Sequence, residues 1–371
     1  MLAPVLTAFV ALASALSAAA APSISLAVEG AEAITSADSF QVTTVITNTG
    51  DETVKLLNDP AGPLSKLPTD TFYITNSKGS SAVFGGIKAK YVPSVAAAQG
   101  GFTVLAPGAS VRVQHDLGQA YNFTSTGVDN YEIEPRNNFY LVNDKGEVST
   151  IRARVASAHS ARVSGKLVSS KLIPTPTLSK RATYVGCSAA RQTLLASAAA
   201  AAQSYAANSY SYISSTTAAR PRYTTWFGAY TSTRRNTVLS HFNAINGNTF
   251  SSYTYDCTCT ESGTYAYVYP DTYICFFLLV CLVCSHTYVI LYRRFGRVYL
   301  CGAFWNAPLT GTDSKAGTLI HESSHFTANG GTDDHVYGQT GAKNLAISNP
   351  NNAVRNADNH EYFAENTPAL S

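Results

Sequence analysis

The pentapeptide His321-Glu322-Ser323-Ser324-His325 constrains the fold and chemistry of this chain more than any other stretch. Residues four positions apart lie on one face of an α-helix, so the imidazoles of His321 and His325 can reach one metal ion. Glu322 then projects beside that ion. The pattern predicts a helix through the pentapeptide and a metal site on one of its faces.

The chemistry of these residue types favours zinc. Zinc accepts neutral imidazole readily, and a catalytic zinc site keeps one coordination position open for water. The metal lowers the pKa of that water, and an adjacent carboxylate such as Glu322 can then remove a proton from it. A chance match is the competing interpretation of so short a pattern, and the residues that follow His325 decide between the two.

The most familiar extension of the pattern is absent. In H-E-x-x-H-x-x-G-x-x-H, a third histidine completes the metal site. Here Ala328 stands where that pattern requires glycine, and Gly331 stands where it requires histidine. The third ligand must therefore come from another position.

An aspartate downstream can supply it. The glycines at positions 330 and 331 can end the helix and turn the chain back, which brings Asp334 to the metal. An aspartate oxygen is an acceptable zinc donor. By residue type alone, Asp333 and His335 compete with Asp334 for this place.

The order of the two motifs resembles that of a known family. Residues 331–338 read Gly-Thr-Asp-Asp-His-Val-Tyr-Gly, and the aspzincins, deuterolysin-like fungal metallopeptidases, pair H-E-x-x-H with G-T-x-D-x-x-Y-G. The resemblance implies one zinc ion per chain, bound by His321, His325 and Asp334, with Glu322 as general base. It also implies that Tyr337 donates a hydrogen bond to the oxyanion of the tetrahedral intermediate.

The C-terminal segment 356–366 is similar to that of the peptidyl-Lys metalloendopeptidases, a basidiomycete branch of the family. Asp358 and Glu361 are three positions apart, so both carboxylates point the same way on a helix. Two such anions can hold a lysine ammonium. The resemblance implies that they line the S1′ pocket and that cleavage occurs on the N-terminal side of lysine. The competing interpretations are a solvated helix face and a role for Glu361 as a zinc ligand.

The organisation of the chain is typical of a secreted zymogen. Residues 1–20 are apolar and end in small residues, which predicts a signal peptide rather than a membrane helix. Residues 21–181 lack cysteine and contain strand-like alternation, which predicts an all-β, sandwich-like pro-region. The pair Lys180-Arg181 follows a proline-containing linker, where a kexin-like protease would cut. The mature domain then covers residues 182–371.

The mature domain is predicted to be α+β. An alanine-rich stretch from Ser188 to Ser215 favours a long helix. Residues 252–259 and 264–269 alternate as strands. We therefore expect a zincin-type domain with helices around a small hairpin sheet.

Residues 272–293 do not fit this pattern, because they form a long apolar run before Arg294. In the enzymes that the chain resembles, the residues on either side of this run almost adjoin. A membrane span, a family-specific loop and a retained intron translated in frame are the competing interpretations. A span would separate the two halves of the domain by a bilayer, so we favour the retained intron.

The cysteine count supports that interpretation. Seven cysteines are an awkward number for a secreted protein. Removal of the apolar run removes three of them, Cys275, Cys281 and Cys284. For the other four, the resemblance implies the pairs Cys187–Cys257 and Cys259–Cys301.

The expected function is that of a secreted, extracellular and monomeric zinc endopeptidase. Its partners would be lysine-containing polypeptides and a kexin-like processing protease. The formal net charge is only +3, and the sequence has no basic stripe that would indicate nucleic-acid binding. We expect no stable membrane association. The alternatives are a deuterolysin of broader specificity that prefers basic proteins, and a secreted β-sandwich binding protein with an inactive C-terminal domain.

Overall fold

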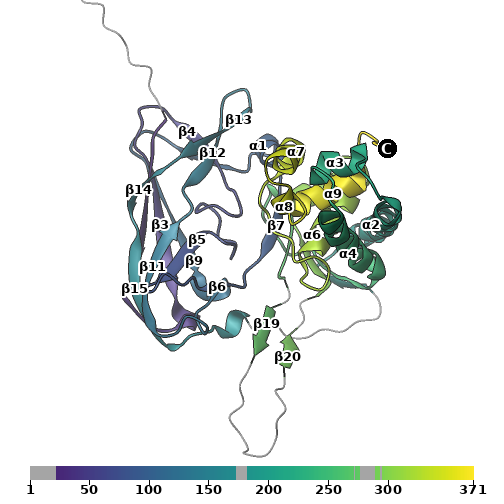
Figure 1. Ribbon diagram of the computed structural model, residues 1–371. Coiled ribbons are helices and arrows are strands. Elements are labelled where there is room, and N and C mark those ends of the chain that lie inside the picture. Colours follow the sequence, from purple (N-terminus) through teal and green to yellow (C-terminus); the bar gives the residue numbers. More distant parts are fainter. Residues whose placement is uncertain (1–21, 173–181, 271, 276–288, 293–294) are drawn as a thin grey trace, which may run out of the picture.

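The computed structural model describes residues 22–172, 182–270, 272–275, 289–292 and 295–371. A β-rich part formed by residues 22–172 lies beside a mixed helical part formed by the later residues (Figure 1). We keep the names pro-region and mature domain for these two parts, as labels taken from the sequence prediction. The predicted signal peptide and the pair Lys180-Arg181 lie outside the described residues.

The strands of the pro-region follow the alternation in its sequence. In β3, every second side chain is buried, because successive residues of a strand point to opposite faces of a sheet. The described strands of the pro-region, apart from β7 (Lys88–Tyr91), form three four-stranded sheets and one short pair. The first sheet contains, in spatial order, β14 (Arg154–Ser157), β1 (Ile24–Gly30), β3 (Gln41–Asn48) and β9 (Ser110–Asp116). The second contains β2 (Ala33–Ser36), β15 (His159–Lys166), β11 (Asp129–Pro135) and β5 (Phe72–Asn76). The third contains β13 (Val148–Arg152), β12 (Asn138–Val142), β4 (Val54–Leu57) and β8 (Phe102–Leu105).

The first sheet contributes to two apolar cores of the pro-region. One core joins it to the second sheet, with Val28 and Val42 against Ile133 and Val163. The other core joins it to the third sheet, and Leu26 belongs to it. The pro-region therefore differs from the predicted antiparallel sandwich in containing two parallel strand pairs, β1 with β14 and β2 with β15. Its remaining short elements are β6 (Val83–Phe84), β10 (Tyr121–Asn122), α1 (Pro93–Ala98), η1 (Ala37–Ser39), η2 (Leu117–Gln119) and η3 (Ser170–Leu172).

The sheet of the mature domain is mixed and not a simple hairpin. Its order is β16 (Thr183–Val185), β17 (Thr254–Asp256), β21 (Arg297–Leu300), β18 (Thr264–Val268) and β7 (Lys88–Tyr91). The first three strands are parallel. Helices α2 (Ala189–Ser215) to α4 (Ser232–Gly247) lie between β16 and β17 in sequence, and β18 lies between β17 and β21. The prediction of a small hairpin sheet is therefore wrong, because the sheet contains parallel as well as antiparallel strand pairs. The edge strand β7 belongs to the pro-region and joins the two parts.

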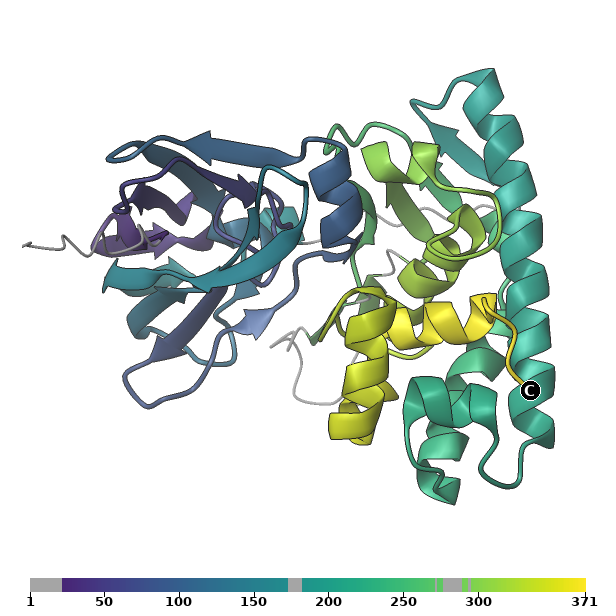
Figure 2. The same cartoon turned by 90° about the horizontal axis from the view of Figure 1, so that it is seen from above.

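Helices cover this sheet and one another (Figure 2). The alanine-rich stretch forms α2, whose N-cap Ser188 accepts a hydrogen bond from Arg191 N. Alanines 198, 199, 202 and 206 on its buried face belong to the apolar core of the domain. The helical elements are α2 (Ala189–Ser215), α3 (Pro221–Phe227), α4 (Ser232–Gly247), η4 (Phe250–Ser252), α5 (Gly302–Asn306), α6 (Lys315–His325), α7 (Gly338–Ser348), α8 (Pro350–Ala353) and α9 (Ala357–Glu365).

Two disulfides tie the mature domain, with the pairing that we expected. Cys187 is bonded to Cys257, and Cys259 is bonded to Cys301. The first links the start of α2 to the end of β17. The second links the region before β18 to the end of β21. Both therefore fix connections of the central sheet.

The apolar run is described only at its ends. There β19 (Thr272–Cys275) and β20 (Val289–Tyr292) pair with each other in a separate two-stranded sheet. Positions 276–288 and 293–294 lie outside the described residues. Among the helices of the described ranges, none has the length and apolarity that crossing a membrane requires.

Candidate active site

The H-E-x-x-H pentapeptide forms the last part of α6, as its spacing predicts. Ser314 caps the helix by accepting a hydrogen bond from Gly317 N at 2.9 Å. Both histidines and Glu322 are fully buried. The Nε2 atoms of His321 and His325 lie 3.2 Å apart, so the two rings converge on one point.

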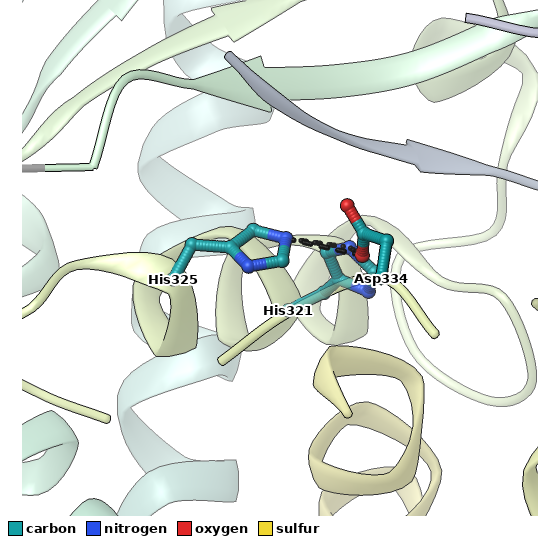
Figure 3. A group of neighbouring side chains, drawn as sticks. All are labelled: His321, His325 and Asp334. Atoms are coloured by element: carbon teal, nitrogen blue, oxygen red, sulfur yellow. Dashed lines mark hydrogen bonds and ion pairs between the residues drawn. The ribbon is translucent and has the colours of Figure 1, made fainter. Parts of the chain in front are cut away.

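A tight turn after α6 brings the third group to that point. The carbonyl oxygen of Phe326 accepts hydrogen bonds from the amides of Asn329, Gly330 and Gly331. Gly331 has a φ of 55°, a left-handed conformation that glycine adopts without strain. The reversed chain then carries Asp334 Oδ1 to 3.2 Å from each of the two Nε2 atoms (Figure 3).

The three donor atoms have the spacing that a zinc ion requires. Donors at about 2.0–2.1 Å around a tetrahedral zinc lie roughly 3.3 Å apart. All three distances between the donors of His321, His325 and Asp334 are 3.2 Å. Asp334 Oδ1 is also buried without a hydrogen-bond donor among the described residues. The cluster therefore fits a zinc ion.

Outer groups orient the histidine rings. His325 Nδ1 lies 2.9 Å from the carbonyl oxygen of Thr332, which places a proton on Nδ1 and leaves the Nε2 lone pair for a metal. His321 Nδ1 lies 2.8 Å from Asp358 Oδ1. Burial opposes ionisation of Asp334, but His325 and His321 hold the pKa of that carboxyl well below its usual range. The cluster can therefore present two imidazoles and one carboxylate.

The competing ligands lie elsewhere. The Asp333 carboxylate, about half exposed, forms an ion pair with Lys88. His335 donates its backbone amide to Asn356 Oδ1 at 2.8 Å. Neither belongs to a potential metal-binding group among the described residues, whereas Asp334 does. The geometry therefore selects Asp334 from the three possibilities that residue type left open.

Glu322 and Tyr337 lie beside the cluster. Glu322 Oε1 accepts a hydrogen bond from Lys90 N at 3.1 Å, and burial raises the pKa of Glu322 to about 8. The Tyr337 hydroxyl donates to the carbonyl oxygen of Ala89 at 3.0 Å. Burial also raises the pKa of Tyr337 well above its usual value, so the phenol keeps its proton. Both groups thus contact one peptide unit of the pro-region.

The carboxylates on α9 line a buried pocket next to the metal cluster. Asp358 and Glu361 are both fully buried, which excludes the solvated helix face. Glu361 Oε2 lies 2.6 Å from Lys90 Nζ, and Asp358 Oδ1 lies 3.8 Å from it. Asp358 Oδ2 accepts a hydrogen bond from Gly338 N at 2.6 Å. Glu361 is therefore the closer partner of the ammonium, while Asp358 also holds the backbone amide at the start of α7.

Sequence reasoning does not identify the third carboxylate of this pocket. Asp313 Oδ1 lies 3.2 Å from Lys90 Nζ and accepts a 2.6 Å hydrogen bond from the Tyr362 hydroxyl. The rings of Tyr265 and Tyr362 face the same ammonium, with centroids 5.1 and 5.4 Å away. Asp313 has a φ of 53°, and it precedes the α6 cap, a position that carries no recognisable motif.

The chain is similar to several known proteins. The family described as lysine-specific metallo-endopeptidase, the aspzincins, matches residues 212–281 and 277–365. The peptidyl-Lys metalloendopeptidase of Grifola frondosa is 54% identical over 100% of both chains. That of Armillaria mellea is 50% identical over 96% of both chains. A solved zinc peptidase from Grifola frondosa is 59% identical, covers 50% of this chain and 100% of its own, and has a TM-score of 0.44.

The family match and the Grifola frondosa relative, together with the cluster on α6, define the chain as a zinc metallopeptidase, an enzyme that hydrolyses peptide bonds. More particularly, the chain belongs to the aspzincin family. The resemblance inferred from H-E-x-x-H and the downstream glycine-threonine motif is thereby confirmed.

Proposed function

We propose that this protein is a secreted endopeptidase that cleaves polypeptides on the N-terminal side of lysine. The observation that carries the proposal is the buried pocket beside the metal cluster, in which Glu361, Asp313 and Asp358 surround one lysine ammonium. A buried cation is stable only where opposite charges compensate for its lost hydration. The names of the full-length relatives support the same specificity.

The zinc ligands in this proposal are His321, His325 and Asp334, with one ion per chain. When bound, zinc lowers the pKa of water and polarises the substrate carbonyl. Glu322 takes a proton from the attacking water and passes it to the leaving amine. Tyr337 donates a hydrogen bond to the carbonyl oxygen as negative charge develops on it. The α9 pocket places lysine immediately after the cleaved bond.

A broader deuterolysin specificity is less well supported. An enzyme that prefers basic proteins needs a diffuse acidic surface, whereas these carboxylates converge on one ammonium. Glu361 as a zinc ligand is also disfavoured, because its Oε2 lies 2.6 Å from Lys90 Nζ. A non-catalytic binding protein would have no need of the complete set of Glu322, Tyr337 and the three donors.

Matched peptides that differ only after the cleaved bond test this specificity. The processed enzyme is assayed on peptides with lysine, arginine or norleucine at that position. Norleucine keeps the apolar stem and lacks the ammonium, so we expect its kcat/KM to fall by roughly 30-fold to 1,000-fold. Arginine should also be disfavoured because the pocket is closed around a compact cation. Equal cleavage of lysine and norleucine would contradict the proposal.

We also propose that the protein is made as a monomeric prepro-enzyme. Residues 1–20 would be removed on secretion, and a kexin-like protease would cut after Lys180-Arg181 to leave a mature domain of residues 182–371. The disulfides support an oxidising compartment. N-terminal sequencing of secreted protein tests the boundaries: ends near residues 21 and 182 are expected, and an intact leader would contradict them.

Residues 272–293 are proposed to derive from a retained intron. The two segments of the family match meet inside this run, and β19 and β20 pair only with each other among the described strands. The two disulfides use four cysteines, and the three others of the sequence all lie in the run. Peptide mapping of secreted protein tests the idea, since a peptide that joins Asp271 to Arg294 is expected. Recovery of peptides from the run alone would contradict it.

A further inference from the structure

The pro-region enters the active site as an extended strand. β7 forms the edge of the catalytic sheet and runs antiparallel to β18, with Lys90 opposite Ala266 and Ala89 opposite Tyr267. In Figure 3 it is the faint blue-violet strand that passes beside the labelled side chains. A peptide that adds a strand to a sheet edge gains main-chain hydrogen bonds, and its side chains fill adjacent pockets.

The Lys90 side chain occupies the α9 pocket. It is fully buried, although a lysine is rarely buried without partners. Its ammonium lies 2.6 Å from Glu361, 3.2 Å from Asp313 and 3.8 Å from Asp358. The pocket therefore holds this lysine as it would hold the lysine of a substrate.

The peptide unit before Lys90 lies between the reactive groups. Its carbonyl oxygen, from Ala89, accepts the Tyr337 hydrogen bond at 3.0 Å. Its nitrogen, from Lys90, donates to Glu322 at 3.1 Å. Ala89 N also donates to Asp334 Oδ2 at 3.2 Å. The group assigned to the oxyanion and the group assigned to proton transfer thus contact the two ends of one peptide bond.

We propose that the pro-region blocks the enzyme as a bound substrate, and that Ala89–Lys90 is the bond that the domain cleaves in its own pro-region. This inference rests on the proposed cleavage before lysine. Water adds to the Ala89 carbonyl carbon, and Glu322 takes its proton. The C–N bond then breaks and the proton passes to the Lys90 nitrogen. The products are an Ala89 carboxylate and a new N-terminal Lys90.

The geometry also provides access to this bond. A pocket between the two parts is lined by Ala89, Asp334 and Tyr337, together with Asp70 and Arg136 of the pro-region. The bound peptide unit therefore borders a cavity, because Ala89 lines it. Cleavage would divide β7 at its centre and so remove the continuous strand that joins the two parts.

The first test measures binding without catalysis. In a Glu322→Gln background, the full chain is cut between residues 181 and 182, and dissociation of the pro-region is followed by native mass spectrometry. Lys90→Met should weaken retention by at least roughly 30-fold. The matched control Lys88→Met, two positions away, should change it less than about threefold, because its ion pair with Asp333 is partly exposed. Equal retention of both variants would overturn the proposal.

The second test identifies the cleaved bond. Full-length protein with intact Glu322 is incubated with zinc, and every new N-terminus is identified by mass spectrometry. A terminus that begins Lys90-Tyr91-Val92 is expected, and it should be absent in Lys90→Arg. New termini at other lysines of the pro-region, with none at Lys90, would overturn the proposal.

An external lysine peptide in the same incubation separates this inference from the proposed function. If that peptide is cut before lysine while Ala89–Lys90 stays intact, only the self-cleavage is wrong. If neither bond is cut by folded, zinc-loaded protein, the proposed function itself fails. The binding test is independent of both results, because it uses a variant without the general base.

Discussion

Asp358 joins the metal cluster to the lysine pocket, because its Oδ1 lies 2.8 Å from His321 Nδ1. The same oxygen lies 3.8 Å from Lys90 Nζ. Glu361 is closer to the ammonium, at 2.6 Å, and its Oε2 is 3.4 Å from His321 Nδ1. One helix, α9, therefore serves both the ligand that holds the metal and the pocket that selects the substrate.

The two α9 carboxylates should consequently differ in their effects. Glu361→Gln removes the nearest charge, so kcat/KM for lysine peptides should fall by roughly 30-fold or more. Zinc affinity should change little. Asp358→Asn should weaken both zinc affinity and lysine cleavage, since outer-shell partners contribute about 10-fold to 100-fold to metal binding. Metal titration and peptide kinetics on the same preparations measure both quantities, and identical profiles for the two variants would contradict this division.

Asp334→Asn should lower zinc affinity at least roughly 100-fold, because it removes a charged donor from the cluster. Asp333→Asn is the matched control, since that carboxylate pairs with Lys88 of the pro-region. Zinc content after dialysis against a competing chelator distinguishes the two. Loss of zinc from Asp333→Asn but not from Asp334→Asn would reverse the ligand assignment.

Glu322→Gln should reduce kcat by about 10²–10⁴-fold, because general-base catalysis contributes that much. Zinc should remain bound, since Glu322 is not one of the three donors. Kinetics on a lysine peptide and metal analysis check the two parts of this prediction. A variant that keeps full activity would remove Glu322 from the mechanism.

Tyr337→Phe should lower kcat by roughly 10²–10³-fold with little change in KM, as expected for a hydrogen bond that strengthens in the transition state. In the unprocessed chain, the ring contact with Tyr91 of the pro-region, at a centroid distance of 6.0 Å, should be retained. Steady-state kinetics of the processed enzyme on a lysine peptide measure the changes in kcat and KM. A rise in KM alone would instead indicate that the phenol only binds substrate.

The full chain should lose stability in acid through His115 of the pro-region. Burial lowers the pKa of His115 to about 4, and in the unfolded chain it returns to about 6.5. The unfolded state then binds the proton first, so stability falls as the pH drops from about 6.5 toward 4, by roughly 3 kcal/mol. Denaturant unfolding across this range should show the loss, and His115→Gln should flatten it. An unchanged pH slope in that variant would exclude His115 as the cause.

Much of the metal site could be predicted because its information is local. The i and i+4 histidines require only a helix, and the turn that delivers Asp334 lies within ten residues of His325. The strand alternation of β3 and the alanine-rich α2 are likewise local patterns. The helix expected from Ser188 to Ser215 is observed from Ala189 to Ser215.

The rest depends on contacts between distant segments. Lys90 reaches Glu361 across 271 positions of sequence, and no pattern around Lys90 indicates that its strand leaves the pro-region. Asp313 joins the pocket only because the chain adopts a left-handed turn before α6. The parallel pairing of β16, β17 and β21 also arises from long connections and not from strand sequence.

An unbiased digest tests the central claim most directly. The processed enzyme is incubated with a mixture of unfolded proteins, and all new N-termini are read by mass spectrometry beside a chelator-treated control. New ends that begin almost entirely with lysine, and that chelation abolishes, are the predicted result. Chelator-sensitive ends spread over many residue types would contradict the assignment of the α9 pocket to lysine.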